Sequence, residues 1–155
     1  MAIEIERKFL VIGSFENYVI SSTQIIQGYL STNPKRNVRI RIAGNKGFLT
    51  IKGIPNQTSV SRFEWETEIP ITEAKELLEI CKPDVLSKTR FIVPEKTGLN
   101  FEVDVFHGDN EGLTIAEIEL PAEGYKFDKP VWLGKEVTGD SRYYNSMLAR
   151  NPIKN

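Results

Sequence analysis

The chain has 155 residues, of which 26% are charged and 40% are hydrophobic, and its formal net charge is −1. This length and composition predict one folded domain over residues 1–155 and exclude a disordered chain. The small net charge argues against general binding to nucleic acid or to membrane surfaces, because both require an excess of lysine and arginine.

Export and membrane insertion are not indicated by the sequence. The first residues lack an apolar stretch of signal length, and no segment has the roughly 20 apolar residues of a membrane span. The single cysteine, Cys81, cannot form an internal disulfide and is expected to be a packed thiol. The single histidine, His107, follows an apolar run at a turn, so we expect a structural role for it. A cytoplasmic location is the resulting expectation.

Apolar and polar residues alternate with a period of two along much of the chain, which is typical of β-strands. Turn sequences at 43–47, 94–98 and 107–112 separate alternating segments and suit antiparallel hairpins. The expected strands are residues 2–11, 23–31, 36–43, 46–54, 60–69, 84–93, 99–107 and 113–120. The sequence therefore predicts a mainly β fold in which neighbours along the chain are neighbours in the sheet.

Two helices are expected beside these strands. The first begins at the N-cap Thr72 and ends before Pro83. The second begins near Asp140 or Ser141, where apolar residues adopt helical spacing. A short helical turn is also expected around residues 13–20.

The charged residues of the strands are sorted by face and by sign. Because successive side chains point to opposite sides of a strand, Glu4, Glu6 and Lys8 share one face of the first strand. Seven of the eight segments have such a charged face, with bases dominant on the third, fourth and sixth and acids dominant on the seventh and eighth. The water-facing side of a sandwich explains any one of these strands, but the sorting by sign favours a shared, enclosed site.

Eight long antiparallel strands can close into a barrel whose interior holds side chains or one small ligand. Charges inside such a barrel are costly unless they are paired, hydrogen-bonded or bound to metal. The basic set, which suits a compact polyanion, is Lys8, Arg39, Arg41, Lys52, Arg62, Lys88 and Arg90. The acidic set, whose hard oxygen ligands suit Mg²⁺ or Mn²⁺, is Glu4, Glu6, Glu64, Asp104, Glu117 and Glu119. The joint interpretation is a polyphosphate bound together with a divalent cation.

Several motifs, in this order, resemble those of the CYTH proteins, also called triphosphate tunnel metalloenzymes. They are EIERK at 4–8, RIR at 39–41, TIKG at 50–53, SRFEWE at 61–66, SKTR at 87–90, EVDVFHG at 102–108, AEIEL at 116–120 and WLGKEVTGDSRYYN at 132–145. The resemblance spans nearly the whole chain, and the sequence is similar to the small bacterial inorganic triphosphatases. It implies a closed eight-stranded antiparallel β-barrel, or tunnel, with a few peripheral helices.

The resemblance also implies roles for individual residues. Glu4 and Glu6 with Glu117 and Glu119 look like metal ligands, and Glu64 and Asp104 are further candidates. The basic set looks like a phosphate clamp, and the residues expected to be catalytic are Lys52, Lys8 and Glu64. Tyr29, in a segment similar to another tunnel strand, is a candidate for substrate binding, with a packed or rim tyrosine as the alternative. By analogy, the C-terminal helix near Arg142 and Tyr143 closes one mouth of the tunnel.

The expected reaction is the divalent-metal-dependent hydrolysis of inorganic triphosphate to pyrophosphate and phosphate. Inorganic triphosphate is favoured because a short chain leaves little material for a pocket that binds a nucleobase. A nucleoside triphosphatase, a class IV-type adenylyl cyclase, a noncatalytic polyphosphate-binding module and a purely structural β domain are the alternatives.

If the charges point inward, the apolar residues of the strands point outward. The outward set is Ile3, Ile5, Val38, Ile40, Phe63, Trp65, Val103 and Ile118. Two or three short helices are not expected to cover all of them, and large exposed apolar patches often mark interfaces. The sequence therefore predicts a homodimer.

Overall fold

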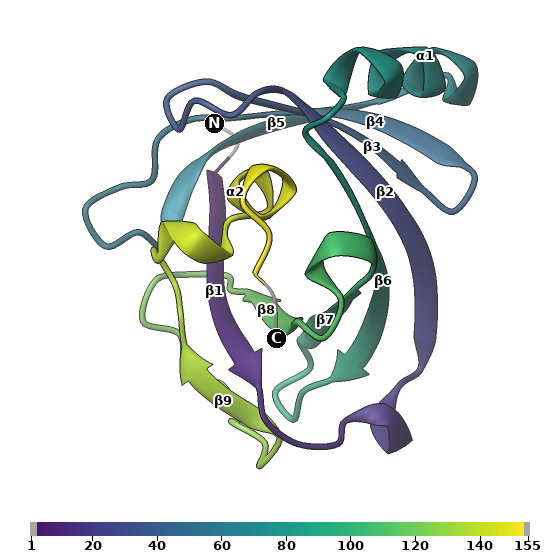
Figure 1. The fold of residues 1–155 in the computed structure, drawn as a ribbon. Helices are drawn as coiled ribbons and strands as arrows, with labels where there is room; N and C mark the ends of the chain where they lie inside the picture. The colour runs from purple at the N-terminus through teal and green to yellow at the C-terminus, as the bar shows by residue number, and fades with distance from the viewer. Residues whose placement is uncertain (1–2, 154–155) are drawn as a thin grey trace.

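The computed structural model describes residues 3–153, which form nine strands, two α-helices and three 3₁₀ turns (Figure 1). The strands are β1 (Ile3–Val11), β2 (Ser21–Ser31), β3 (Asn37–Ala43), β4 (Lys46–Lys52), β5 (Ser61–Ile69), β6 (Val85–Pro94), β7 (Asn100–Phe106), β8 (Thr114–Glu119) and β9 (Leu133–Glu136). The helices are α1 (Ile71–Cys81) and α2 (Asn145–Arg150), and the 3₁₀ turns are η1 (Glu16–Tyr18), η2 (Gly108–Asn110) and η3 (Ser141–Tyr143).

The sheet closes on itself as an antiparallel barrel. Its strand order is β5-β4-β3-β2-β6-β7-β8-β1-β9, and an additional pairing joins β5 to β1. β1 makes the closure, because its start at Ile3–Ile5 pairs with β5 while Glu6–Leu10 pair with β8. The predicted closed eight-stranded barrel is confirmed, with β9 added on the edge of β1.

Some elements differ from their predicted form. β9 was not expected, because four residues are too few to show an alternating pattern. The first helix has its N-cap at Pro70 rather than Thr72, and the Ala74 N–H donates to the Pro70 carbonyl at 3.0 Å. The predicted second helix is divided into η3 and α2 because Tyr144 between them is extended, with φ −67° and ψ 135°.

Part of the outer surface is covered by α1, which lies against β2, β3 and β4 (Figure 1). Ile40 on β3 is fully buried in a cluster with Ala74, Leu78 and Cys81 of the helix. Gly28 on β2 makes this close approach possible, since a Cβ there would lie 2.6 Å from the Cys81 Cβ. The packed thiol expected of Cys81 is confirmed.

Loops cover a second part of the outer surface, over β1, β6, β7 and β8. Val103 and Ile118 are fully buried in a cluster that includes Phe101 and Trp132, whose rings are 5.1 Å apart. Of the outward set, Ile40 is therefore covered by a helix, and Val103 and Ile118 are covered by loops. Ile3, Phe63 and Trp65 do remain exposed, at 49%, 41% and 44%.

One end of the barrel interior is apolar. Leu86, Phe106 and Ile115 continue the inward-facing rows that carry Lys88, Asp104 and Glu117, and they are buried against Leu148 of α2. The sequence predicted charge along these rows but not this apolar end. The charged part of the interior is consequently closed on one side by packed hydrocarbon. Neither helix within residues 3–153 has the length and apolar character needed to cross a membrane.

Candidate active site

The charged part of the interior is a cavity of about 180 Å³. Its lining residues are Glu4, Glu6, Lys8, Tyr29, Asn37, Arg39, Arg41, Lys52, Arg62, Glu64, Glu66, Lys88, Arg90, Glu102, Glu117, Glu119, Tyr144, Asn145 and Ser146. All seven predicted basic residues, Tyr29 and five of the six predicted acidic residues are among them. The alternation of side chains along each strand therefore predicted which charged residues share the inward face and line this cavity.

Asp104 is the predicted acidic residue that does not line the cavity. It is fully buried; its carboxylate lies 2.8 Å from Lys88 Nζ as an ion pair and accepts from Arg90 Nε and Nη2 at 2.8 and 2.9 Å. These cations occupy both of its oxygens and hold the pKa of Asp104 below its usual value against the effect of burial. Asp104 thus lies behind the clamp and positions Lys88 and Arg90, which is not the geometry expected of a metal ligand.

The two cations held by Asp104 differ in their protonation. Burial and the charges of Arg90 and Arg41 lower the pKa of Lys88 to about 7, although Asp104 opposes this change. Burial would also lower the pKa of Arg90, but the carboxylates of Asp104, Glu102 and Glu117 raise it well above the ordinary value. At neutral pH, this wall of the cavity therefore holds a fixed guanidinium beside an amine that can exchange a proton.

The neighbouring arginines on β3 are only partly neutralised. Burial and the charges of Arg39 and Arg90 lower the pKa of Arg41 to about 9, and its guanidinium donates only to Gln27 Oε1, at 3.3 Å, among the described residues. Arg39 donates to Thr50 and to Glu66, at 3.0 and 3.4 Å. Its buried Nε has no hydrogen-bond partner within residues 3–153. Because a buried guanidinium N–H without a partner is costly, this donor is available to an acceptor that enters the cavity, such as water or a ligand.

Two carboxylates flank Lys52 near the start of β1. Lys52 Nζ lies 2.8 Å from Glu4 and 3.4 Å from Glu64. Burial would raise the pKa of Glu4, but a hydrogen bond with Glu64 and the charge of Lys52 outweigh it and lower that pKa to about 2. Burial, the same hydrogen bond and the negative charge of Glu4 raise the pKa of Glu64 to about 7. The pair thus holds one proton at moderately acid pH, on Glu64.

A second carboxyl pair joins β1 to β8. Burial and the charges of Glu117 and Glu4 raise the pKa of Glu6 well above its ordinary value. Glu117 is the partner that stays ionised, because Lys8, the hydrogen bond with Glu6 and Arg90 hold its pKa well down against burial. Glu119 lies opposite Glu6, and partial burial with the charges of Glu4 and Glu102 raises its pKa. Like charges therefore crowd this side of the cavity, which is the situation that a bound cation relieves.

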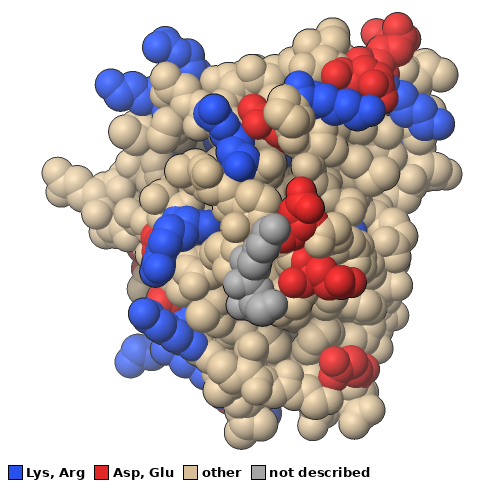
Figure 2. Space-filling model, in the orientation of Figure 1, with Lys and Arg blue, Asp and Glu red and all other residues tan. Residues whose placement is uncertain are grey.

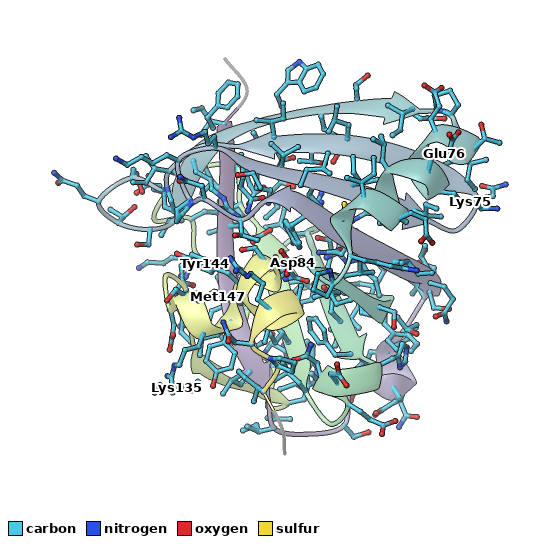
Figure 3. The ribbon with its side chains drawn as sticks, turned by 45° about the horizontal axis from the view of Figure 1, so that its top comes forward. Lys75, Glu76, Asp84, Lys135, Tyr144 and Met147 are labelled. Carbon is cyan, nitrogen blue, oxygen red and sulfur yellow. The ribbon has the colours of Figure 1, made fainter. Side chains whose placement is uncertain are left out.

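The C-terminal segment closes the cavity at its apolar end. Tyr144, Asn145 and Ser146 reach the lining, and the Tyr144 ring lies 5.7 Å from Lys8 Nζ and 5.9 Å from Arg62 Cζ. Figure 3 shows Tyr144 and Met147 on this segment, below the upper strands. Arg142 is instead an exposed partner of Asp140, and Tyr143 packs in the apolar end. Closure of one mouth by this region is as expected, but the residues that reach the cavity are the next three along the chain.

Charged side chains also lie on the outer face that Figure 2 shows. Lysine and arginine lie along its left and upper edges, and most acidic residues lie right of centre and at the upper right (Figure 2). The cavity is lined by seven basic and seven acidic side chains. The interior site is therefore built mostly from charged groups.

Sequence reasoning missed several lining residues. Asn37, Glu66 and Glu102 lie on inward faces of β3, β5 and β7, so the same alternation that found Arg39 and Glu64 was the available signal. Tyr144, Asn145 and Ser146 had no such signal, because a helix after a long connection has no register with the strands. Within residues 3–153, no three His, Cys, Asp or Glu side chains form a ready-made metal cluster.

Comparisons with known proteins agree with this architecture. Residues 2–147 match the family model of the CYTH domain. An inorganic triphosphatase of Acetivibrio thermocellus is 47% identical over 156 residues, which is 100% of this chain and 98% of that protein. An inorganic triphosphatase of Nitrosomonas europaea is 36% identical over 149 residues, covering 94% and 96% of the two chains.

Solved structures show the same fold. A crystal structure of an inorganic triphosphatase superposes with a TM-score of 0.70 at 35% identity and covers 96% of this chain and 95% of the other. A putative adenylyl cyclase from Hippeastrum, described as having a dominant triphosphatase activity, has a TM-score of 0.55 at 16% identity over 79% of this chain and 80% of its own. This more distant likeness concerns the fold alone. The match to the family model over residues 2–147, the relatives at 47% and 36% identity and the shared barrel show that the chain belongs to the CYTH domain family.

Proposed function

We propose that the protein is a divalent-metal-dependent triphosphatase that hydrolyses inorganic triphosphate to pyrophosphate and phosphate inside the barrel. The observation that carries the proposal is the enclosed cavity in which seven basic side chains converge with a cluster of carboxyl groups. Two relatives of nearly the same length are named inorganic triphosphatases, which supports this choice of substrate.

The basic residues are suited to bind the phosphate chain. Arg39 and Arg41 come from β3, and Lys88 and Arg90 come from β6, so two strands separated only by β2 supply four cations to the cavity. Arg39 Nε, which lacks a hydrogen-bond partner in the described part of the chain, and the weakly neutralised Arg41 have donors to offer. Arginine can hold two phosphate oxygens at once, whereas lysine acts as a point charge. Tyr29, which lines the cavity and accepts from Gln27 at 2.9 Å, is a further group within this wall.

The carboxyl groups fit a divalent cation. The lining contains as many acidic as basic residues, so a polyanion would leave the cavity with excess negative charge unless a cation entered with it. Glu4, Glu6, Glu117 and Glu119 would hold the ion, with Glu64 close by. Mg²⁺ commonly uses one or two carboxylates together with substrate oxygens and water, so the lack of a three-residue cluster in the described chain is compatible with such a site. When bound, Mg²⁺ or Mn²⁺ would neutralise phosphate charge and polarise the phosphoryl group.

Catalysis by this chain's own residues would consist of positioning and charge stabilisation. Phosphoryl transfer needs little covalent help from the protein, because charge on the oxygens is the main obstacle. Lys52 and Lys8 are placed on the carboxyl side of the cavity, where each can stabilise charge that develops during transfer. Glu64, with a pKa raised to about 7, is suited to exchange a proton with the attacking water at neutral pH.

The cavity gives a nucleobase little to bind. Its only aromatic lining residues, among those the structure describes, are Tyr29 and Tyr144. Tyr29 is 5% exposed, and Tyr144 lies beside Lys8 and Arg62, so neither offers an open stacking platform. Inorganic triphosphate therefore fits the cavity better than a nucleotide does.

A turnover panel tests the proposal. The protein would be incubated with tripolyphosphate or ATP, with Mg²⁺, Mn²⁺ or EDTA, and the products separated by ion chromatography. We expect pyrophosphate and phosphate from tripolyphosphate, only with metal, and much slower turnover of ATP. Faster release of phosphate from ATP would favour a nucleotidase, and cyclic AMP would favour a cyclase. Tight binding of tripolyphosphate without hydrolysis under either metal would favour a noncatalytic module.

We further infer that the exposed outer face of β5 is a homodimer interface. Ile3 lies opposite Phe63, and Trp65 lies opposite Ile51, so the apolar residues form one continuous strip. Light scattering across micromolar concentrations should give the mass of a dimer for the wild type and of a monomer for Trp65→Glu. A monomer mass for the wild type at every concentration would contradict this inference.

A further inference from the structure

Asn145, the first residue of α2, inserts a side-chain oxygen into the buried polar network of the cavity. Asn145 Oδ1 accepts from Lys88 Nζ at 2.8 Å and from Gln27 Nε2 at 3.3 Å. Both partners are donors, so the amide oxygen and not the amide nitrogen must face them. The residue comes from the end of the chain, 57 positions from Lys88 and 118 from Gln27.

Lys88 is held by few groups, and Asn145 is one of them. Its side chain is 1% exposed; its ammonium lies 2.8 Å from the Asp104 carboxylate and donates to Asn145 Oδ1 at 2.8 Å. Because Lys88 also lines the cavity, these two contacts hold its ammonium beside the space where the phosphate chain would lie.

Gln27, on β2 between β6 and β3, extends the same control to Arg41. It is fully buried, its Nε2 also donates to the Tyr29 hydroxyl at 2.9 Å, and its Oε1 accepts from Arg41 Nε and Nη2 at 3.3 Å. The amide of Gln27 is thus oriented by Asn145 on one side and presents its oxygen to Arg41 on the other. One acceptor on α2 therefore influences the position of cations on two different strands.

Packing outside the network brings Asn145 to this place. Leu148 is fully buried in the apolar end of the barrel, and its carbonyl accepts from Asn110 Nδ2 at 3.0 Å. Asn110 Oδ1 in turn accepts from the Ile153 N–H at 3.0 Å. A substitution at Asn110 therefore weakens docking of the C-terminal segment, whereas a substitution at Asn145 removes the acceptor and leaves the docking contacts in place.

Resting on the triphosphatase function proposed above, we propose that Asn145 is a positioning residue: docked α2 supplies the acceptor that aligns Lys88, and through Gln27 also Arg41, with the transferring phosphoryl group. Removing it leaves every cation in place, so substrate is still attracted, but their alignment with the transition state is lost. Such a change lowers kcat more than it alters KM.

The test compares variants of the full chain with tripolyphosphate and Mg²⁺. We expect Asn145→Ala to lower kcat at least about tenfold with KM changed less than about threefold. Asn145→Asp, which keeps an oxygen for both donors, should retain a higher kcat than the alanine variant. Met147→Ala, on the solvent side of the same helix, should behave as wild type. Asn110→Ala should lower the melting temperature while retaining most of kcat at a temperature where it is folded.

Two results would overturn the inference. One is a kcat for Asn145→Ala within twofold of that of Met147→Ala. The other is an equal kcat loss in Asn110→Ala, which would show that α2 docking alone matters. If the wild type does not hydrolyse tripolyphosphate, the proposed function fails, but the ¹⁵N NMR signal of the Lys88 ammonium still tests the contact. A signal that shifts or broadens in Asn145→Ala and not in Met147→Ala supports the contact, and an unchanged signal refutes it.

Discussion

Replacement of Asp104 by asparagine separates the two roles that this carboxylate could have. Asp104 is fully buried, forms an ion pair with Lys88 and accepts two charge-assisted hydrogen bonds from Arg90. Asparagine has nearly the same shape, but it removes the negative charge and turns an amide N–H₂ toward a cation. Lys88 and Arg90 then lose the buried carboxylate that they share, and Arg90 keeps its contacts with Glu102 and Glu117, at 3.2 and 3.7 Å.

The expected cost follows from that loss. Removing one partner of a buried ion pair typically destabilises a protein by about 3–5 kcal/mol, because the remaining charge is uncompensated. For a chain of this length, that corresponds to a melting temperature lower by about 6–20 °C. If Asp104 were instead a metal ligand among crowded carboxylates, the same substitution would raise the melting temperature in EDTA, because removing one negative charge relieves repulsion between the others.

The assay is thermal unfolding followed by circular dichroism in EDTA, with Glu102→Gln as the matched control. Glu102 also pairs with Arg90, at 3.2 Å, but its side chain is 37% exposed, so the control should change stability by less than about 1 kcal/mol. A melting temperature for Asp104→Asn within about 2 °C of the wild type in EDTA would refute the counter-ion role. It would return Asp104 to the set of candidate ligands.

Three further predictions concern the carboxyl side of the cavity. Lys52→Ala should lower kcat/KM for tripolyphosphate at least about tenfold, or about 1.4 kcal/mol of transition-state stabilisation, and a smaller loss in steady-state assays would remove Lys52 from the clamp. The double variant Glu4→Ala, Glu6→Ala should lose metal-dependent turnover, and unchanged phosphate release at any Mg²⁺ concentration would end the metal proposal. Glu64 has a folded pKa raised to about 7, above the value of about 4.3 in unfolded chains. Its contribution to the free energy of unfolding is therefore fully present below about pH 4.3 and is lost as the pH rises through 7. Urea unfolding in EDTA at pH 5 and 7.5 should show a smaller difference for Glu64→Gln than for the wild type, and an equal difference would contradict the assignment of the proton to Glu64.

The local alternation of the sequence determined the walls of the cavity. Arg39 and Arg41, or Glu4 and Glu6, must share a face wherever their strand lies, because side chains in a strand alternate regardless of its neighbours. Closure of the sheet into a barrel could be inferred as well. Seven of the eight predicted strands have a charged face, and so many charges favour an interior in which they bind a ligand or an ion. For this reason, the barrel and thirteen of the fourteen predicted site residues agree with the structure's cavity lining.

Only the tertiary structure decided how deep each residue lies and which residues share a proton. Glu102 and Asp104 occupy the same face of β7, yet Glu102 reaches the cavity while Asp104 is sealed behind Lys88 and Arg90. Depth along a closed barrel depends on strand tilt and stagger, which a single strand's sequence does not encode. Asn145 shows the same limit, because its place beside Lys88 is set by packing of α2 in the apolar end and not by any pattern in its own segment.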